Sequence, residues 1–149
     1  FVRATLRGEP VFLRNPKSVR PWQHVLEPLY GYLLIAEALC KDGVVHAGGW
    51  NFGPADDDAV AVETVVGTLA SLWGAPARWS GAQGSHLHEA HFLKLDSSKA
   101  RGLLRWKPRL GLRMALAWTV EWYKNCAEGA NAHALCLKQI EHYEELACR

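Results

Sequence analysis

Three basic side chains, Arg14, Lys17 and Arg20, lie within seven residues, beside an Asn-Pro turn and just ahead of Trp22. An arginine can hold a diphosphate with paired donors, in a geometry that a lysine cannot match. A solvated basic loop is the plain alternative, because clusters of charge are common on protein surfaces. The segment is therefore a candidate phosphate-binding site, and the rest of the chain has to decide between the two interpretations.

A second group of ligand-binding side chains consists of His86, His88, Glu89 and His91. Imidazole and carboxylate are good zinc ligands, but a helical zinc-protease site needs His-Glu-x-x-His, and here His88 and His91 are only three apart. In an extended segment His86 and His88 would share one face while His91 pointed away. We predict no metal site. A phosphate or sugar site is favoured, with a polar surface loop as the alternative.

The chain carries no motif for bond breaking. It has no Gly-x-Gly-x-x-Gly, no Gly-x-x-x-x-Gly-Lys, no nucleophile elbow and no Tyr-x-x-x-Lys pair. We therefore predict ligand-binding residues but neither catalytic nor cofactor-binding residues in this chain.

The composition suits one compact domain: 149 residues, 49% of them hydrophobic. The formal net charge of +2 is too small to recruit nucleic acid along a whole face. The apolar stretches fall short of the roughly twenty residues that span a bilayer. These features predict that the protein has no nucleic-acid partner and no membrane partner. They also predict a cytoplasmic setting.

The four cysteines, Cys40, Cys126, Cys136 and Cys148, are widely spaced and form no Cys-x-x-Cys pair. The spacing argues against a zinc ribbon or a redox motif. Three of them lie inside helical patterns, so we expect buried structural thiols.

Periodicity predicts several helices and short strands, a mixed α/β layer that packs against something else. Residues 1–8 have the spacing of a helix end without an N-cap, so we expect a fragment of a longer protein. The helix at 26–39 is apolar nearly all round and should be largely buried. The other expected helices are 62–73, 97–104, 112–123 and 135–146, and the expected extended segments are 10–13, 22–25, 48–54, 77–80 and 92–95, with a solvated turn at 56–58.

Several segments, taken together, resemble the CDP-glucose 4,6-dehydratase family. The most specific is Arg-Pro-Trp-Gln-His-Val at 20–25, where related sugar dehydratases and epimerases usually carry Arg-Asp-Trp or Arg-Asp-Tyr. The resemblance runs from about residue 1 to 124. The other matching segments are Gly-Glu-Pro-Val at 8–11, Arg-Asn-Pro at 14–16, Trp-Asn-Phe-Gly-Pro at 50–54, His-Glu-Ala-His at 88–91, Leu-Lys-Leu-Asp-Ser-Ser-Lys-Ala at 93–100 and Leu-Arg-Trp-Lys-Pro at 104–108.

The resemblance implies an α/β fold: the C-terminal substrate-binding part of an extended short-chain dehydrogenase/reductase, over residues 1–149, with the Rossmann core absent. It implies a CDP-sugar substrate, NAD bound by the missing N-terminal Rossmann domain, and a homo-oligomer. In such enzymes NAD oxidises C4 of the glucose, water leaves across C5 and C6, and the hydride returns to C6. The product, CDP-4-keto-6-deoxyglucose, would serve deoxysugar biosynthesis for lipopolysaccharide O-antigen, and the fragment alone should be inactive.

The resemblance also implies a set of substrate contacts. Arg20 matches an arginine that contacts the diphosphate, and Glu89 matches an acidic residue that contacts the ribose. A cation is usual three residues before that acid, but this chain has His86 there, and a neutral imidazole gives a weaker grip. The predicted substrate-binding residues are Val11, Phe12, Leu13, Arg14, Arg20, Trp22, His86 and Glu89.

Two alternatives stay open. The chain could belong to another NAD-dependent nucleotide-sugar dehydratase or epimerase, or it could be a non-catalytic binding module that keeps the scaffold.

Overall fold

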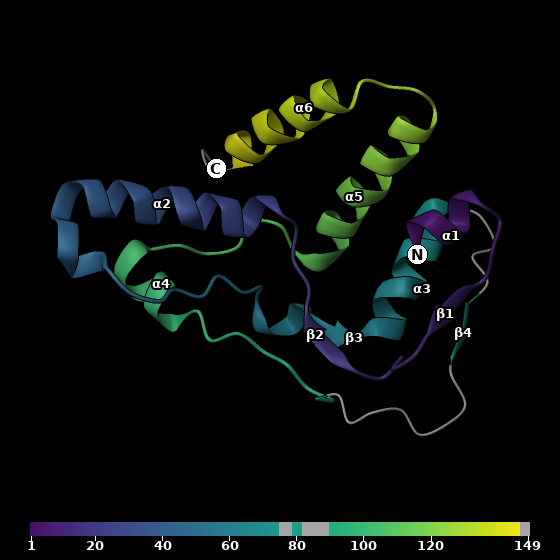
Figure 1. Ribbon diagram of the computed structural model, residues 1–149, viewed down its shortest axis with the longest axis horizontal. Coiled ribbons are helices and arrows are strands. Elements are labelled where there is room, and N and C mark those ends of the chain that lie inside the picture. Colours follow the sequence, from purple (N-terminus) through teal and green to yellow (C-terminus); the bar gives the residue numbers. More distant parts are fainter. Residues whose placement is uncertain (75–78, 82–89, 147–149) are drawn as a thin grey trace.

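The computed structural model describes residues 1–74, 79–81 and 90–146. Within these residues, helices and short strands alternate along the chain, and helices dominate (Figure 1). The α-helices are α1 (Val2–Leu6), α2 (Leu26–Asp42), α3 (Val62–Trp73), α4 (Ser98–Leu104), α5 (Leu112–Ala127) and α6 (Ala132–Glu145), with 3-10 turns η1 (Gly43–His46) and η2 (Asp56–Asp58).

The strands form two small two-stranded sheets. In the first, β1 (Val11–Leu13) runs parallel to β4 (Trp79–Gly81). In the second, β2 (Val19–Pro21) runs antiparallel to β3 (Ala59–Ala61), with Arg20 opposite Val60. The strand expected at 10–13 is confirmed.

Two other strand predictions are wrong. The strand expected at 22–25 lies three residues earlier, as β2, because β3 pairs there. Residues 48–54 form no strand, since their polar groups bond to side chains instead: the N–H of Gly53 donates to Ser97 Oγ at 2.7 Å, and the carbonyl of Phe52 accepts from Gln23 Nε2 at 2.7 Å. The segment 92–95 makes one isolated bridge, between Phe92 and Val19.

The predicted helices are present, and local sequence explains their ends. Gly74 ends α3 in the left-handed region at φ 76°, which glycine adopts without strain. Asn131 caps the N-terminus of α6, because its side chain accepts the N–H of Ala134 at 3.0 Å. The helix therefore starts at Ala132, three residues earlier than the apolar stripe indicates. A long-range cap begins α5: Asp58 Oδ1 accepts the N–H of Leu112 at 3.0 Å. The aspartate turn at 56–58 is therefore not wholly solvated.

The prediction that α2 is largely buried is wrong. Its buried residues are Glu27 and Gly31, whereas Leu29, Tyr32 and Leu33 are 45%, 57% and 69% exposed. One face of α2 packs on η1 and α4. The opposite apolar face stays largely exposed, although Tyr32 meets the ring of Phe52 with centroids 5.8 Å apart.

The core consists of three clusters of buried side chains. In the first, Val11 and Leu13 of β1 pack against Val66 of α3. The second cluster lies between α4 and α2 and consists of Phe52, Ala100 and Trp106. The third, around α5 and α6, consists of Leu110, Ala115, Trp118 and Tyr143.

The expectation of buried cysteines is wrong for two of them. Cys40 and Cys136 are exposed, Cys126 is half-buried, and all three are free thiols. Cys40 lies on the uncovered side of α2 and Cys136 on an exposed part of α6, so no core reaches them; Cys148 lies outside the described residues. Among the described helices, none combines the length and apolar character that crossing a membrane requires.

Candidate functional site

Arg20 lies at the centre of β2, and its guanidinium is held by two segments of backbone. Its Nη1 donates to the carbonyl of Val19 at 2.8 Å and to the carbonyl of Ala90 at 2.9 Å. Two carbonyls from segments far apart in sequence restrict the rotamers of a long side chain that would otherwise be mobile. The arginine predicted to contact a diphosphate is therefore oriented before any ligand arrives.

The backbone beside Arg20 joins the same two segments. The N–H of Val19 donates to the carbonyl of His91 at 2.8 Å, and the N–H of Leu93 donates to the carbonyl of Val19 at 3.2 Å. These bonds set residues 90–93 alongside β2. Ala90, which Arg20 contacts, directly follows Glu89 in the sequence.

Two of the predicted site residues, His86 and Glu89, lie outside the described residues, and so does His88. His91 is described and is exposed. Among the residues that the structure describes, no group of three or more histidine, cysteine or acidic side chains could hold a metal ion. The His86 and Glu89 contacts stay predictions.

The β1 residues divide between core and surface. Val11 and Leu13 are 7% and 8% exposed and pack against Val66. Phe12, between them, is 62% exposed, and Arg14 just after the strand is exposed. Because side chains alternate along a strand, the side chains available to a ligand here are Phe12 and Arg14, while Val11 and Leu13 could offer only backbone groups.

Trp22 is held by the second sheet. Its Nε1 donates to the carbonyl of Val60 at 3.1 Å, and the indole is half-buried. The next residue, Gln23, reaches the carbonyl of Phe52. The structure thus ties Trp22 and Gln23 to two different segments, which holds the chain that follows Arg20 in place.

His24, the next residue, turns inward and is 6% exposed. Its Nδ1 accepts the N–H of Leu26 at 3.3 Å. Its ring and that of Trp118 pack edge to face, with the ring centroids 5.7 Å apart. Burial lowers the pKa of His24 below its ordinary value, because the desolvated imidazolium is disfavoured. His24 is therefore a neutral core residue at neutral pH.

Glu27 is a functional candidate that the sequence analysis missed. The side chain is fully buried, at 0% exposure. Its Oε1 accepts the N–H groups of Arg109 at 2.9 Å and Leu110 at 2.7 Å, and its Oε2 accepts the hydroxyl of Tyr143 at 2.8 Å. The available sequence signal was an acid in the first turn of an apolar helix, which usually marks only a favourable helix dipole.

Tyr143 and Arg109 complete the surroundings of Glu27. Burial raises the pKa of Tyr143, and its hydrogen bond to Glu27 raises that pKa further. The guanidinium carbon of Arg109 lies 3.9 Å from the ring centroid of Tyr30 and 4.8 Å from that of Tyr143. The buried carboxylate thus has hydrogen-bond donors on both oxygens and a cation in its neighbourhood.

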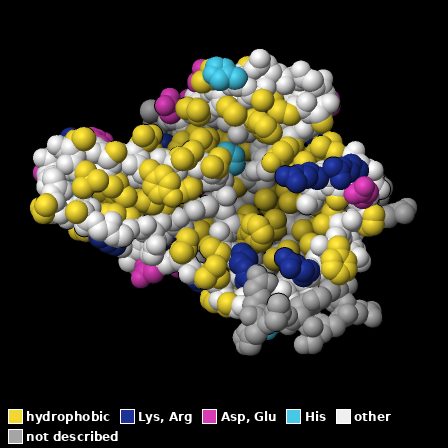
Figure 2. Space-filling model, viewed as in Figure 1, with side chains coloured by type: hydrophobic (Ala, Val, Ile, Leu, Met, Phe, Trp, Pro, Cys, Tyr) yellow, Lys and Arg dark blue, Asp and Glu magenta, His cyan; other side chains and the backbone are white. Residues whose placement is uncertain are grey.

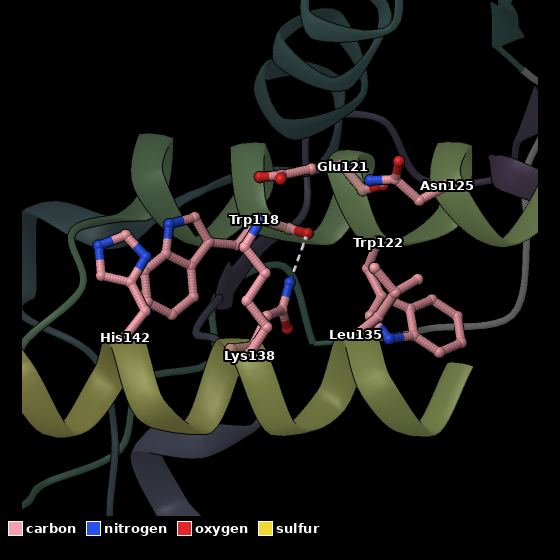
Figure 3. Close-up of a pocket in the computed structure, with 8 residues that line it drawn as sticks. Trp118, Glu121, Trp122, Asn125, Leu135, Lys138 and His142 are labelled. Atoms are coloured by element: carbon pink, nitrogen blue, oxygen red, sulfur yellow. Dashed lines mark hydrogen bonds between the residues drawn. The ribbon is translucent and has the colours of Figure 1, made fainter. Parts of the chain in front are cut away.

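A separate cavity of about 190 Å³ lies between α5 and α6 (Figure 3). His142 stacks on Trp118 with ring centroids 4.7 Å apart, and Gln139 Nε2 donates to the carbonyl of Trp118 at 2.9 Å. Trp118 is 8% exposed and packs in the core. Of the predicted site residues that the structure describes, none lines this cavity.

Comparison with known proteins relates the whole chain to nucleotide-sugar enzymes. It is 43% identical over all 149 residues to a CDP-glucose 4,6-dehydratase from Salmonella typhimurium, and spans 42% of that protein's length. No family model matches. Among solved structures, MoeE5 in complex with UDP-glucuronic acid and NAD superposes with a TM-score of 0.68 at 29% identity, over 84% of this chain and 40% of that one.

A second solved structure shares the fold. UDP-glucuronic acid 4-epimerase from Bacillus cereus, in complex with UDP-glucuronic acid and NAD, gives a TM-score of 0.69 at 18% identity, over 84% of this chain and 38% of that one. The resemblance to the CDP-glucose 4,6-dehydratases is confirmed along the whole chain. The predicted fold, that of the C-terminal part of extended short-chain dehydrogenase/reductases, is confirmed as well.

Proposed function

We propose that this chain is the nucleotide-sugar-binding part of a CDP-glucose 4,6-dehydratase, which converts CDP-glucose into CDP-4-keto-6-deoxyglucose and water. The observation that carries the proposal is the position of Arg20. It stands in the Arg-Pro-Trp-Gln-His-Val segment, and its guanidinium is bound to Ala90, the residue that follows Glu89. The predicted diphosphate contact and the predicted ribose contact thus belong to segments that meet. Identity of 43% along the whole chain supports the same assignment.

Electrostatics favour the Arg20 region for an anion. Arg14 and Lys17 precede Arg20 in the chain, and both are exposed. Figure 2 shows several Lys and Arg side chains among hydrophobic ones on one face of the molecule. With a formal net charge of only +2, attraction for a diphosphate must be local. Exposed Phe12 adds an apolar surface on which a nucleotide base could rest.

The residues of this chain do not fit a site for NAD. Dinucleotide sites lie at the carboxyl ends of an open parallel sheet, with a glycine-rich turn at a helix N-terminus. The described residues form two sheets of two strands each, and the sequence has no glycine fingerprint. We assign NAD, and the chemistry it supplies, to the part of the full-length protein that this chain does not span. The chain alone should be inactive.

The uncovered face of α2 suits a partner surface. Val25, Leu29, Tyr32 and Leu33 are exposed and fall on one side of the helix at spacings of three and four residues. Figure 2 shows the hydrophobic side chains that cover this helix. Exposed apolar patches of this kind mark interaction sites. The occupant that fits the proposed function is the NAD-binding part of the full-length enzyme.

Further parts of the proposal follow from the resemblance alone. They are a homo-oligomeric enzyme and a role in supplying deoxysugars for lipopolysaccharide O-antigen. The proposal also keeps what composition and charge predict: a cytoplasmic location and no nucleic-acid or membrane partner.

One specific observation favours a second candidate, an NAD-dependent enzyme acting on a different sugar nucleotide. MoeE5, at 29% identity, was solved with UDP-glucuronic acid. The two candidates differ in the base and sugar that the site accepts, and both use an arginine for the diphosphate.

The test is calorimetric titration of the 149-residue chain with CDP, UDP and dTDP. We expect CDP to bind most tightly. Arg20→Ala should weaken CDP binding by about 1 to 3 kcal/mol, the usual range for losing a charge-assisted hydrogen bond. The matched control is Arg113→Ala, which removes an exposed arginine at the start of α5 and should leave the affinity unchanged. Equal affinity for the three nucleotides would reject the CDP assignment, and an unchanged affinity in Arg20→Ala would remove Arg20 from the site.

Catalysis has its own test, in the DNA that encodes this chain. An upstream reading frame with a glycine fingerprint and a Tyr-x-x-x-Lys pair is expected for the enzyme. A stop codon just upstream of Phe1 would instead indicate a free-standing binding module.

A further inference from the structure

The buried carboxylate of Glu27 joins three parts of the chain that are far apart in sequence. It lies in the first turn of α2 and accepts hydrogen bonds from Arg109 and Leu110, 82 and 83 residues later. It also accepts from Tyr143 in α6, 116 residues later. Burying a charge is costly unless it is fully hydrogen-bonded. These three bonds satisfy both oxygens, so the burial of this carboxyl group is compensated.

The backbone of Glu27 extends the same connection toward Phe52. The Glu27 carbonyl accepts Trp106 Nε1 at 3.3 Å, and Trp106 is 1% exposed. Trp106 meets the ring of Phe52 at 5.0 Å, edge to face. The same Phe52 ring lies against Gly31, one turn along α2 from Glu27, so closely that a Cβ there would overlap it.

Two sets of contacts lead from Phe52 back to the segment that contains Arg20. In the first, Gln23, three residues after Arg20, donates from its Nε2 to the Phe52 carbonyl. In the second, the next residue after Phe52, Gly53, donates to Ser97 Oγ, and the chain runs back from Ser97 to residues 91–93, which bond to Val19. These contacts close a ring that contains β2 and residues 90–97. Glu27 and Trp106 support the ring from its buried side.

We propose that Glu27 is a positioning residue of the nucleotide-sugar site: its carboxylate holds residues 106–110 against α2 and, through Trp106 and Phe52, fixes the two segments that orient Arg20. This proposal rests on the proposed function for its ligand, but the geometric link does not need a ligand.

A carboxylate suits this position, because it accepts from all three partners. In Glu27→Gln one oxygen becomes an NH₂ group. Facing the N–H groups of Arg109 and Leu110, it would place a donor against donors; facing the Tyr143 hydroxyl, which can also accept, it would reverse that bond. In either orientation the bonds lose the strength that the negative charge gives them. The variant keeps the volume and shape of the side chain, so it isolates this effect.

The direct test is amide hydrogen exchange of the 149-residue chain, followed by NMR. The reporters are the amides of Val19 and Leu93, which join the two segments around Arg20. The control is Val120→Ala, which removes packing at a residue that is 4% exposed. Val120 takes no part in the contacts that connect Glu27 to Arg20. Temperatures are chosen so that both variants have equal global stability. We expect Glu27→Gln to lose protection at both reporters by about 10-fold more than the control, as local opening predicts. Equal loss in the two variants would overturn the proposal.

Two further measurements keep the test decisive. If Glu27→Gln does not fold, Tyr143→Phe removes one of the three bonds to the carboxylate. It should lower protection at Val19 and Leu93 by a smaller factor, and unchanged protection there would overturn the proposal. The second measurement is CDP affinity, which should fall in Glu27→Gln and hold in Val120→Ala. If the wild-type chain does not bind CDP, the proposed function is rejected. The hydrogen-exchange result would still decide whether Glu27 positions the segments around Arg20.

Discussion

Arg20 opens the Arg-Pro-Trp-Gln-His-Val segment and Glu27 lies just beyond its end, seven residues later, yet their surroundings differ completely. Arg20 is half-buried on a two-stranded sheet, and its guanidinium donates to backbone carbonyls. Glu27 is fully buried, and its carboxylate bonds to residues from the loop before α5 and from α6. The difference shows that one stretch of chain serves two purposes. Its first part faces outward, where a ligand could meet it, and its last part anchors the fold that holds the first.

The comparison predicts that substitutions beside Glu27 cost stability, while substitutions near the proposed ligand surface do not. Trp106→Ala should show the largest effect. It removes a side chain that is 1% exposed, and a cavity of that kind lowers the free energy of unfolding by about 3 to 5 kcal/mol. Phe12→Ala, at a residue 62% exposed, should lower it by less than about 1 kcal/mol. Urea denaturation followed by circular dichroism measures both, and similar losses would erase the distinction between the two regions.

Gly31→Ala tests how tightly α2 meets Phe52. The new methyl group would overlap the Phe52 ring, so we expect a loss of about 1 to 3 kcal/mol from overpacking. The control is Gly67→Ala in α3, where a Cβ meets nothing within 4 Å. That change should stabilise the protein by about 0.5 to 1 kcal/mol, because alanine is the better helix former. Thermal unfolding separates the two outcomes, and a neutral Gly31→Ala would mean that Phe52 can move freely.

The smallest effect that we predict is a dependence of stability on alkaline pH. The pKa of Tyr143 in the folded state is raised, first by burial and then by its bond to Glu27. The unfolded chain therefore releases this proton first, near pH 10. The stabilisation is complete below that pH and declines as pH rises above it, by at most about 1.4 kcal/mol per pH unit.

Comparison of variants isolates this contribution of Tyr143. Denaturation at a series of alkaline pH values should show a shallower decline in Tyr143→Phe than in the wild type. Tyr123→Phe, at an exposed position, serves as the control and should follow the wild type. A decline of the same slope in Tyr143→Phe would mean that the phenol is not coupled to folding.

Much of the fold could be predicted from local patterns. The periodicity of apolar residues located α3 and α5. Gly74 marked the end of α3, because few other residues adopt a left-handed φ. The short apolar run at 10–13 indicated β1. These features depend on residues that are neighbours in the chain, so their signal lies within a short window.

Other features could not be predicted, because they depend on distant segments. The position of β2 is set by β3, some forty residues away, and the start of α5 is capped by Asp58 from another turn. The exposure of α2 was mispredicted because an apolar helix has the same pattern whether a neighbour covers it or not. Of the site, the sequence indicated Arg20 and Trp22, but neither the Ala90 contact of Arg20 nor the Val60 contact of Trp22.

By itself, the sequence determined most helices and the family resemblance, and it predicted which residues would bind a nucleotide sugar, since each is a matter of local spacing or of motif. Only the tertiary structure decided which charged residue of the Arg20 to Glu27 segment faces outward and which is buried. The physical reason is that burial of Glu27 becomes tolerable only when donors arrive from residues 109, 110 and 143, and no local pattern records that meeting.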